Sequence, residues 1–324
     1  EPLSSTRVTF SRQERVTIPA GAYMVSDPVG MKVAALDHLA VSIYFPSAPA
    51  QQTGHPGSRA TSYIQRGNHV ERENLPEARQ VDHWYQLAGL DVEAGDTSRA
   101  LLVIGDSITD GFGVQPNTDR RWTDFLIARI REDPGLKGTL AVLNVGLGGN
   151  RLLLDGLGPN GLARFDRDVL DRPGARQVIV ALGVNDLGTL SRSESATQRD
   201  HENLVQQIIG AYEQMVARAR EKDIEIIGAT ITPFRGSTFY PSDDLTEASR
   251  QKVNAWIRTP GNFDAVIDFD ALLRSPEDPA RMDARFDSGD HLHPSVAGYE
   301  AMAKFVPLEL FANSPPDPAR ARLR

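Results

Sequence analysis

A strand pattern that breaks at a glycine and a serine constrains the fold of this chain more than any other feature. The apolar run 101–104 is followed directly by Gly105, Asp106 and Ser107. A short apolar run that ends at a glycine is typical of a strand inside a parallel sheet. Ser107 therefore stands where a strand turns into a helix, at the edge where open α/β folds place their chemistry. The alternative is that this serine only caps the helix, since a capping serine stands at the same place.

Strands and helices alternate along the sequence beyond residue 98. We expect strands at 100–104, 140–145, 178–182, 224–230 and 265–268, and helices at 121–132, 161–170, 202–222, 245–257 and 295–311. Such alternation predicts a parallel sheet with right-handed crossovers and helices on both faces.

The first 97 residues have a different pattern. Short runs at 7–10, 15–18 and 39–45 predict strands, and residues 47–67 are rich in turn-forming residues and predict a loop. We therefore expect a small β-rich accessory domain over 1–97 and an α/β catalytic domain over 98–324. Because three or four short strands make a marginal sheet on their own, the β-rich domain is expected to be incomplete.

A serine on a strand-end turn acts as a nucleophile only beside a base and an oxyanion site. Asp290 and His293 lie three residues apart, just before the expected helix 295–311. This spacing lets a carboxylate hold one imidazole nitrogen while the other accepts a proton. His291 competes for the role of base, and Asp287 competes for that of the orienting carboxylate. In isolation, this spacing more often marks a surface pair.

Two further strand ends offer hydrogen-bond donors for an oxyanion. The strand at 140–145 runs into a glycine-rich segment that ends at Gly149 and Asn150, where a backbone N–H is free to donate. The strand at 178–182 is followed by Gly183 and Asn185, whose amide can donate a second hydrogen bond. Such turns follow many strands for conformational reasons alone. Their order between a serine and a D-x-x-H pair favours an acyl-transfer site.

These four segments together resemble the SGNH/GDSL hydrolase superfamily. They are Gly105-Asp106-Ser107, Asn144 with Gly149 five residues later, Gly183-Val184-Asn185-Asp186, and Asp290 with His293. The resemblance covers about 99–312 and implies a flavodoxin-like three-layer α/β/α sandwich with a parallel five-stranded sheet. It implies Ser107 as nucleophile, His293 as general base and Asp290 as orienting carboxylate. The implied oxyanion hole consists of the N–H groups of Ser107 and Gly149 and the side chain of Asn185.

A looser resemblance concerns the runs 18–21, 26–29 and 39–44, which look like the β domain of bacterial acetylxylan-esterase-like members of the superfamily. Residues 149–153 and 161–168 are similar to the same subgroup, in which further strands usually precede the point where this chain begins. The resemblance implies a serine esterase that removes small acyl groups, above all acetyl, from carbohydrate. A lysophospholipase, a thioesterase or a general short-chain carboxylesterase is the alternative within the same chemistry. A non-catalytic carbohydrate-binding protein on an esterase scaffold is the alternative from another class.

Candidate substrate contacts flank the nucleophile and the oxyanion glycine, and they are Asp106, Asn150 and Arg151. Arg151 could equally pair with Asp155, four residues on, if this segment is helical. The aromatic residues at 83–85, Phe112 and Trp122 could line a groove for sugar rings, although aromatic side chains more often pack in a core.

Composition narrows the partners and cofactors. The formal net charge of −8 argues against nucleic acid and anionic membrane surfaces, and no apolar run approaches the length of a membrane span. Cysteine is absent and the histidines are scattered, so we expect no metal and no organic cofactor. The expected partner is a small-molecule or glycan ester. We expect a secreted or periplasmic protein, while the lack of cysteine is compatible with the cytoplasm as well.

Overall fold

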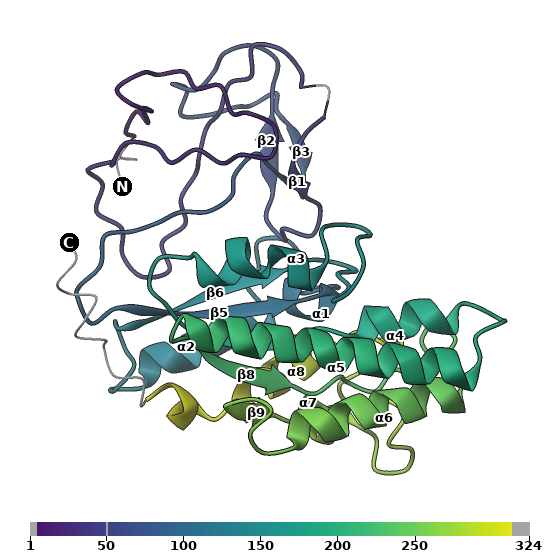
Figure 1. The fold of residues 1–324 in the computed structure, drawn as a ribbon. Coiled ribbons are helices and arrows are strands. Elements are labelled where there is room, and N and C mark those ends of the chain that lie inside the picture. The colour runs from purple at the N-terminus through teal and green to yellow at the C-terminus, as the bar shows by residue number, and fades with distance from the viewer. Residues whose placement is uncertain (1–4, 50, 313–324) are drawn as a thin grey trace.

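Five parallel strands form the central sheet of the computed structural model, which describes residues 5–49 and 51–312 (Figure 1). In chain order they are β5 (Arg99–Gly105), β6 (Leu140–Gly146), β7 (Ala175–Ala181), β8 (Glu225–Ala229) and β9 (Ala265–Ile267). Their order across the sheet is β6-β5-β7-β8-β9. The predicted parallel sheet is confirmed. After β5 the chain adds β6 on one side of it and then β7 on its other side, so the direction of strand addition reverses at β5. Open α/β folds bind ligands at such a reversal.

Helices cover both faces of the sheet. One face packs against α3 (Gly161–Phe165), α4 (Val184–Ser191), α5 (Gln198–Glu221) and α6 (Asp244–Arg258), and the other against α2 (Trp122–Glu132), α7 (Phe269–Leu273) and α8 (Val296–Phe305). The short helix α1 (Ser107–Asp110) follows β5 directly. These three layers confirm the predicted α/β/α sandwich.

Two expected helices differ in detail from the structure. The helix expected at 295–311 ends at Phe305, and a separate turn of 3₁₀-helix follows at Leu308–Phe311. Pro307 lies between them and has no N–H to continue the ladder of hydrogen bonds. The helix expected at 161–170 changes from α3 to a turn of π-helix at Asp166–Leu170. Helices α4 and α7 were not expected from the sequence.

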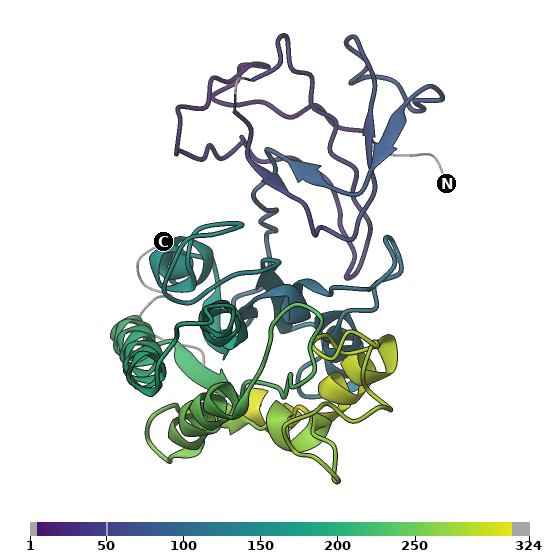
Figure 2. The same ribbon diagram turned by 90° about the vertical axis from the view of Figure 1, so that its right-hand side faces the viewer.

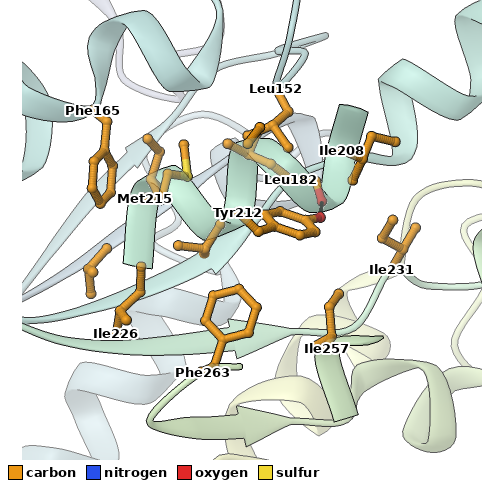
Figure 3. Packing of buried hydrophobic residues seen from close by; sticks show 14 of the residues in the cluster. Leu152, Phe165, Leu182, Ile208, Tyr212, Met215, Ile226, Ile231, Ile257 and Phe263 are labelled. Carbon is orange, nitrogen blue, oxygen red and sulfur yellow. Dashed lines mark hydrogen bonds between the residues drawn. The ribbon is translucent and has the colours of Figure 1, made fainter. Parts of the chain in front are cut away.

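The core explains why β5 is a continuous apolar run. Leu102 and Ile104 belong to one hydrophobic cluster, whereas Leu101 and Val103 belong to the cluster on the opposite face. Side chains alternate along a strand, so a strand covered on both faces is apolar at every position. Figure 3 shows the first cluster, in which Tyr212 of α5 lies among the aliphatic side chains and its hydroxyl donates to the Leu182 carbonyl at 2.7 Å.

Among the described residues before β5 the strands are short, and this segment lies on one side of the α/β part (Figures 1 and 2). They are β1 (Gly54–His55), paired with β4 (Trp84–Tyr85), and β2 (Ser62–Ile64), paired with β3 (Arg79–Val81). β1 and β2 fall inside the stretch that was expected to be a loop. The division into domains at 97/98 stays a prediction, and its ends at 1–4 and 313–324 lie outside the described residues.

The strands expected at 7–10, 15–18 and 39–45 are wrong, since these runs form no strand. Only Phe10 makes an isolated bridge, to Gln13. Alternating hydrophobicity predicts a strand when an apolar surface covers one face. Here Ile18 and Ile43 remain 46% and 47% exposed, so this condition is not met.

A buried arginine joins the carboxyl ends of β5 and β6. Arg164 of α3, 2% exposed, donates to the Gly105 carbonyl at 3.1 Å and to the Val145 carbonyl at 2.7 Å. The same guanidinium donates to Asn150 Oδ1 at 3.0 Å and forms an ion pair with Asp168 at 3.2 Å. Burial alone would raise the pKa of Asp168, but Arg167 and Arg164 outweigh it and hold that pKa below its usual range. Arg164 therefore fixes the strand ends that Ser107 and Gly149 follow.

Replacement of Arg164 by Met should lower the free energy of unfolding by roughly 3–5 kcal/mol, because it leaves the buried Asp168 without its inner partner. Arg167→Met is the matched control. Arg167 bonds the same carboxylate but is exposed, so its loss should cost about 1 kcal/mol or less. Urea unfolding of both variants measures the difference, and equal losses would contradict the structural role of Arg164.

Candidate active site

The turn between β5 and α1 holds Ser107 at the edge of the sheet. Asp106 caps α1 and accepts a hydrogen bond from the Ile108 N–H at 2.9 Å. A Cβ atom at Gly105 would lie 2.2 Å from Thr109 Oγ1, so only glycine lets α1 pack this closely on the strand end. The local sequence thus forces the chain to turn at once and places Ser107 in the first turn of the helix.

The structure brings Ser107, His293 and Asp290 together in one hydrogen-bonded row. The Ser107 hydroxyl lies 2.8 Å from His293 Nε2, and His293 Nδ1 lies 2.7 Å from Asp290 Oδ2. The other oxygen of Asp290 accepts the backbone N–H groups of Leu292 and His293 at 2.9 and 2.8 Å. With Nδ1 donating to the carboxylate, Nε2 is left as the acceptor for the serine proton.

The competing histidine forms a separate pair. His291 Nδ1 lies 2.5 Å from Asp287 Oδ2, and its side chain is 45% exposed, against 4% for that of His293. Both pairs have a histidine and a carboxylate, but the hydroxyl of Ser107 bonds to His293. His291 and Asp287, which the sequence left open as an alternative pair, therefore bond to each other and not to Ser107.

Burial and neighbouring charges set the protonation of the row. Burial lowers the pKa of His293, while the hydrogen bond and charge of Asp290 oppose this and the charge of Arg59 adds to it. Burial would raise the pKa of Asp290, but its hydrogen bonds with His293 and Leu292 outweigh that and lower it. Phe112 stacks on the imidazole with ring centroids 4.0 Å apart, and Phe239 meets it edge-on at 5.3 Å. The imidazole is therefore neutral at neutral pH, beside an ionised carboxylate.

Asn185 has a fixed orientation in the first turn of α4. Its Nδ2 donates to the Asn150 carbonyl at 3.0 Å, and its Oδ1 accepts the hydroxyl of Tyr240 at 2.7 Å. A carbonyl only accepts hydrogen bonds, so the amide nitrogen must be the atom that faces Asn150. The second N–H of that amide can then donate to a ligand. Sequence reasoning missed Tyr240, which lies far from Asn185 along the chain and belongs to no local motif.

The loop that carries Gly149 is held by carboxylates from other elements. Asp186 of α4 accepts the N–H groups of Leu152 and Leu153 at 2.7 and 3.0 Å, and Asp110 of α1 accepts that of Gly148 at 3.1 Å. Burial raises the pKa of Asp186 to about 6. Gly149 itself has φ +69°, a backbone conformation that favours glycine. Sequence reasoning assigned no role to either carboxylate, although Asp186 lies next to Asn185 in its motif.

Two of the expected substrate contacts have partners inside the protein. Asp106 is buried, which raises its pKa to about 7, and it bonds to the Ile108 amide. Asn150 is also buried, with its amide nitrogen on the Pro159 carbonyl and its oxygen on Arg164.

The third, Arg151, donates to the carbonyls of Leu154 and Asp155. The alternative of a helical pair with the Asp155 carboxylate is wrong, because the segment after Arg151 forms bends rather than a helix.

The aromatic residues singled out in the sequence separate in the structure. Phe112 lies against His293, whereas Trp122 is fully buried and meets Phe269 edge-on at 5.5 Å. Trp84 and Tyr85 lie on β4, in the segment before the sheet. Of these, only Phe112 contacts a residue of the hydrogen-bonded row.

Metal-ligating side chains do not cluster in the described part of the chain. Within residues 5–49 and 51–312, no three His, Asp or Glu side chains are grouped so that they could hold a metal ion. Among the same residues, no helix is both long and apolar enough to cross a membrane.

The arrangement suits attack by a serine on a carbonyl carbon. A buried neutral imidazole 2.8 Å from a hydroxyl can take its proton, and an ionised carboxylate stabilises the imidazolium that forms. The Asn185 amide and the backbone N–H groups of Ser107 and Gly149 belong to the same edge of the sheet. Such donors stabilise negative charge that develops on a carbonyl oxygen.

Comparison with known proteins finds one protein family and a set of solved structures that are similar to this chain. A model of the GDSL-like lipase/acylhydrolase family matches residues 103–301. No curated protein sequence matches the chain. Similar solved structures include a GDSL-like lipase from Bacteroides thetaiotaomicron, which is 17% identical with a TM-score of 0.45 over 64% of this chain and 85% of that one. A variant of an acetyl xylan esterase from Geobacillus stearothermophilus is 21% identical with a TM-score of 0.46, over 63% of this chain and 91% of that one.

The pH dependence of ester hydrolysis should identify the base. On a neutral ester, kcat/KM should fall in acid as His293 gains a proton, with a midpoint below the ordinary imidazole value of about 6.5. The shift is downward because burial and Arg59 disfavour the imidazolium more than Asp290 favours it. His293→Ala should remove nearly all activity, whereas His291→Ala should keep both the activity and the midpoint. Equal losses in the two variants would mean that His293 is not the base.

Proposed function

Because the chain belongs to the GDSL-like lipase/acylhydrolase family and is a carboxylic ester hydrolase, we propose that it removes small acyl groups, above all acetyl, from carbohydrate. The proposed machinery is a triad of Ser107, His293 and Asp290, with an oxyanion hole of Asn185, Gly149 and the Ser107 N–H. The single observation that carries the proposal is the 2.8 Å contact between the Ser107 hydroxyl and His293 Nε2, in a site where Asp290 holds Nδ1.

In the first half-reaction, Ser107 Oγ attacks the acyl carbon while His293 Nε2 takes the hydroxyl proton. The carbonyl oxygen gains the negative charge and accepts hydrogen bonds from the Asn185 amide and the two backbone N–H groups. When the tetrahedral intermediate collapses, His293 gives its proton to the departing alcohol and the acyl group stays on Ser107. Water then repeats the same steps, again with His293 as base, and releases the carboxylic acid.

A side chain beside Gly149 favours a small acyl group. Leu157 Cδ1 lies only 2.8 Å from the position of a Cβ atom built on Gly149, so this leucine occupies the space next to the proposed oxyanion hole. We propose that a long acyl chain on this side of the site would have to displace Leu157, whereas acetyl would not.

One observation favours the alternative of a lysophospholipase or thioesterase. Leu154 and Leu157 are largely exposed, and Phe112 and Phe239 also reach the surface beside His293. Exposed apolar side chains beside a catalytic serine can bind a longer acyl chain. The choice between the two functions therefore depends on whether Leu157 blocks or binds the chain.

The organisation of the chain is part of the proposal. We take residues 98–324 as the catalytic domain and 1–97 as an accessory domain, and the proposal gains support from the match of the family model to residues within the former range. A location outside the cytoplasm belongs to the same proposal, because polymeric carbohydrate is met there.

Replacement of the nucleophile tests the proposed mechanism. Ser107→Ala should lower turnover of p-nitrophenyl acetate by up to about a millionfold, since the other members of the triad cannot act without it. The parent enzyme should release p-nitrophenol in a burst if the acyl-enzyme accumulates. Hydrolysis at a rate near that of the parent would remove Ser107 from the mechanism.

A series of acyl chain lengths tests the substrate class. For p-nitrophenyl esters, kcat/KM should fall steadily from acetate to octanoate, and acetate should be released from acetylated xylan. Leu157→Ala should raise the octanoate-to-acetate ratio if this leucine blocks the chain, and should lower it if the leucine binds the chain. A parent enzyme that prefers octanoate and releases no acetate from acetylated glycans would move the assignment to the lipid alternative.

A further inference from the structure

The segment after β1 is fastened to the loop that follows α1. The Arg121 guanidinium donates to the Ser58 carbonyl at 2.5 Å, and the Asn117 N–H donates to the Arg59 carbonyl at 2.9 Å. The Asn117 side chain completes the connection, since its oxygen accepts the Thr61 N–H at 2.9 Å and its nitrogen donates to the Thr61 hydroxyl at 2.8 Å. These bonds bring Arg59 to the active-site side of the α/β part, although the two segments are far apart in sequence.

Arg59 has an unusual backbone conformation within this connection. Its φ is +52°, in the left-handed region that side-chain-bearing residues rarely adopt. Such a conformation persists only where the surroundings hold it, and it occurs preferentially at functional sites. The hydrogen bonds on either side of Arg59 provide this restraint.

The guanidinium of Arg59 lies against Phe112, the ring that stacks on the imidazole of His293. Its central carbon is 5.8 Å from the ring centroid of Phe112, and the same ring stacks on His293 with centroids 4.0 Å apart. Its Nε is buried and has no hydrogen-bond partner in the described part of the chain. No carboxylate among residues 5–49 and 51–312 forms an ion pair with it. A cation without an acidic partner is notable here, because the protein carries a net charge of −8.

The position of Arg59 relates it to one part of the substrate. His293 gives its proton to the departing alcohol, so the alcohol must lie beside Nε2. The acyl oxygen lies instead near Asn185 and Gly149, on other loops. We therefore infer that a guanidinium on the Phe112 side of His293 borders the alcohol rather than the acyl group.

We propose that Arg59 is a carboxylate-binding residue for the alcohol part of the substrate, which makes esters of acidic alcohols the preferred class, such as an acylated sugar acid. The inference rests on the proposed function and deepens it. A guanidinium presents a fork of N–H donors that matches the two oxygens of a carboxylate. Nε is buried, but the two terminal nitrogens of the fork have no hydrogen-bond or ion-pair partner among the described residues, and they are left for such a ligand beside Phe112.

A matched pair of esters tests this subsite. In 4-carboxyphenyl acetate and 4-carbamoylphenyl acetate the leaving groups have the same shape and differ in charge. The parent enzyme should prefer the carboxylate in kcat/KM, and Arg59→Gln should reduce that preference by roughly tenfold or more, the size expected for a charge-assisted hydrogen bond. Arg59→Lys should keep part of the preference, because it keeps the charge but loses the fork. Rising salt should weaken the preference in the parent enzyme.

Arg79→Gln is the control, since Arg79 lies on β3 in the same part of the chain and is exposed. It should leave the preference unchanged. Thermal unfolding of each variant shows whether the N-terminal segment still folds. An Arg59→Gln variant that folds and keeps the full preference would overturn the inference. The inference would also be overturned if Arg59→Gln only shifted the midpoint of the pH dependence, by the same amount for both esters. Arg59 would then act on the protonation of His293 and not on the alcohol. Ser107→Ala tests the proposed function separately. It should abolish hydrolysis of both esters, whatever the ratio of their kcat/KM values in the parent enzyme.

Discussion

The buried guanidinium of Arg164 is the interaction on which the geometry of this site depends. It joins the carbonyls at the ends of β5 and β6 and the side chain of Asn150. The carbonyl of Asn150 in turn receives the amide of Asn185. One charged group is thus connected to all three segments that carry the proposed oxyanion donors, those of Ser107, Gly149 and Asn185, without touching the reacting atoms. Its burial would be costly if Asp168 did not supply the opposite charge.

Irregular loops at a sheet edge need other partners for the N–H groups that a helix or strand would satisfy. Here carboxylates supply them: Asp186 accepts two N–H groups of the loop after β6, and Asp110 accepts a third. The site therefore gathers buried acids that do not take part in the proton transfer, and burial raises the pKa of two of them, Asp106 to about 7 and Asp186 to about 6. A shifted pKa at an active site can therefore belong to a residue that holds the surrounding backbone in place, as well as to one that takes part in the reaction.

Sequence reasoning predicted the features that depend on local patterns. The sheet followed from continuous apolar runs such as that of β5, and Ser107, Asp290 and His293 were singled out from turn position and spacing. The strands expected at 7–10, 15–18 and 39–45 were wrong, because alternation along a segment does not reveal whether another strand will pair with it. Helix α4 was missed because its first residues, Val184 and Asn185, read as a turn after β7. Tyr240, Asp110 and Arg59 were missed for a common reason: each acts on a residue to which no local pattern connects it.

The N-terminal segment contacts two residues that support the proposed machinery. His55 of β1 lies 2.8 Å from Asp110, which holds the Gly148 N–H in the oxyanion loop. Arg59 lies against Phe112, which stacks on His293. Neither contact uses an atom of the serine, the imidazole or the orienting carboxylate. Changes in this segment can therefore alter which alcohol is accepted while the row of Ser107, His293 and Asp290 keeps its geometry. If the proposed roles hold, the sheet edge carries the reaction, and Arg59 of a segment outside the sheet contributes to the choice of substrate.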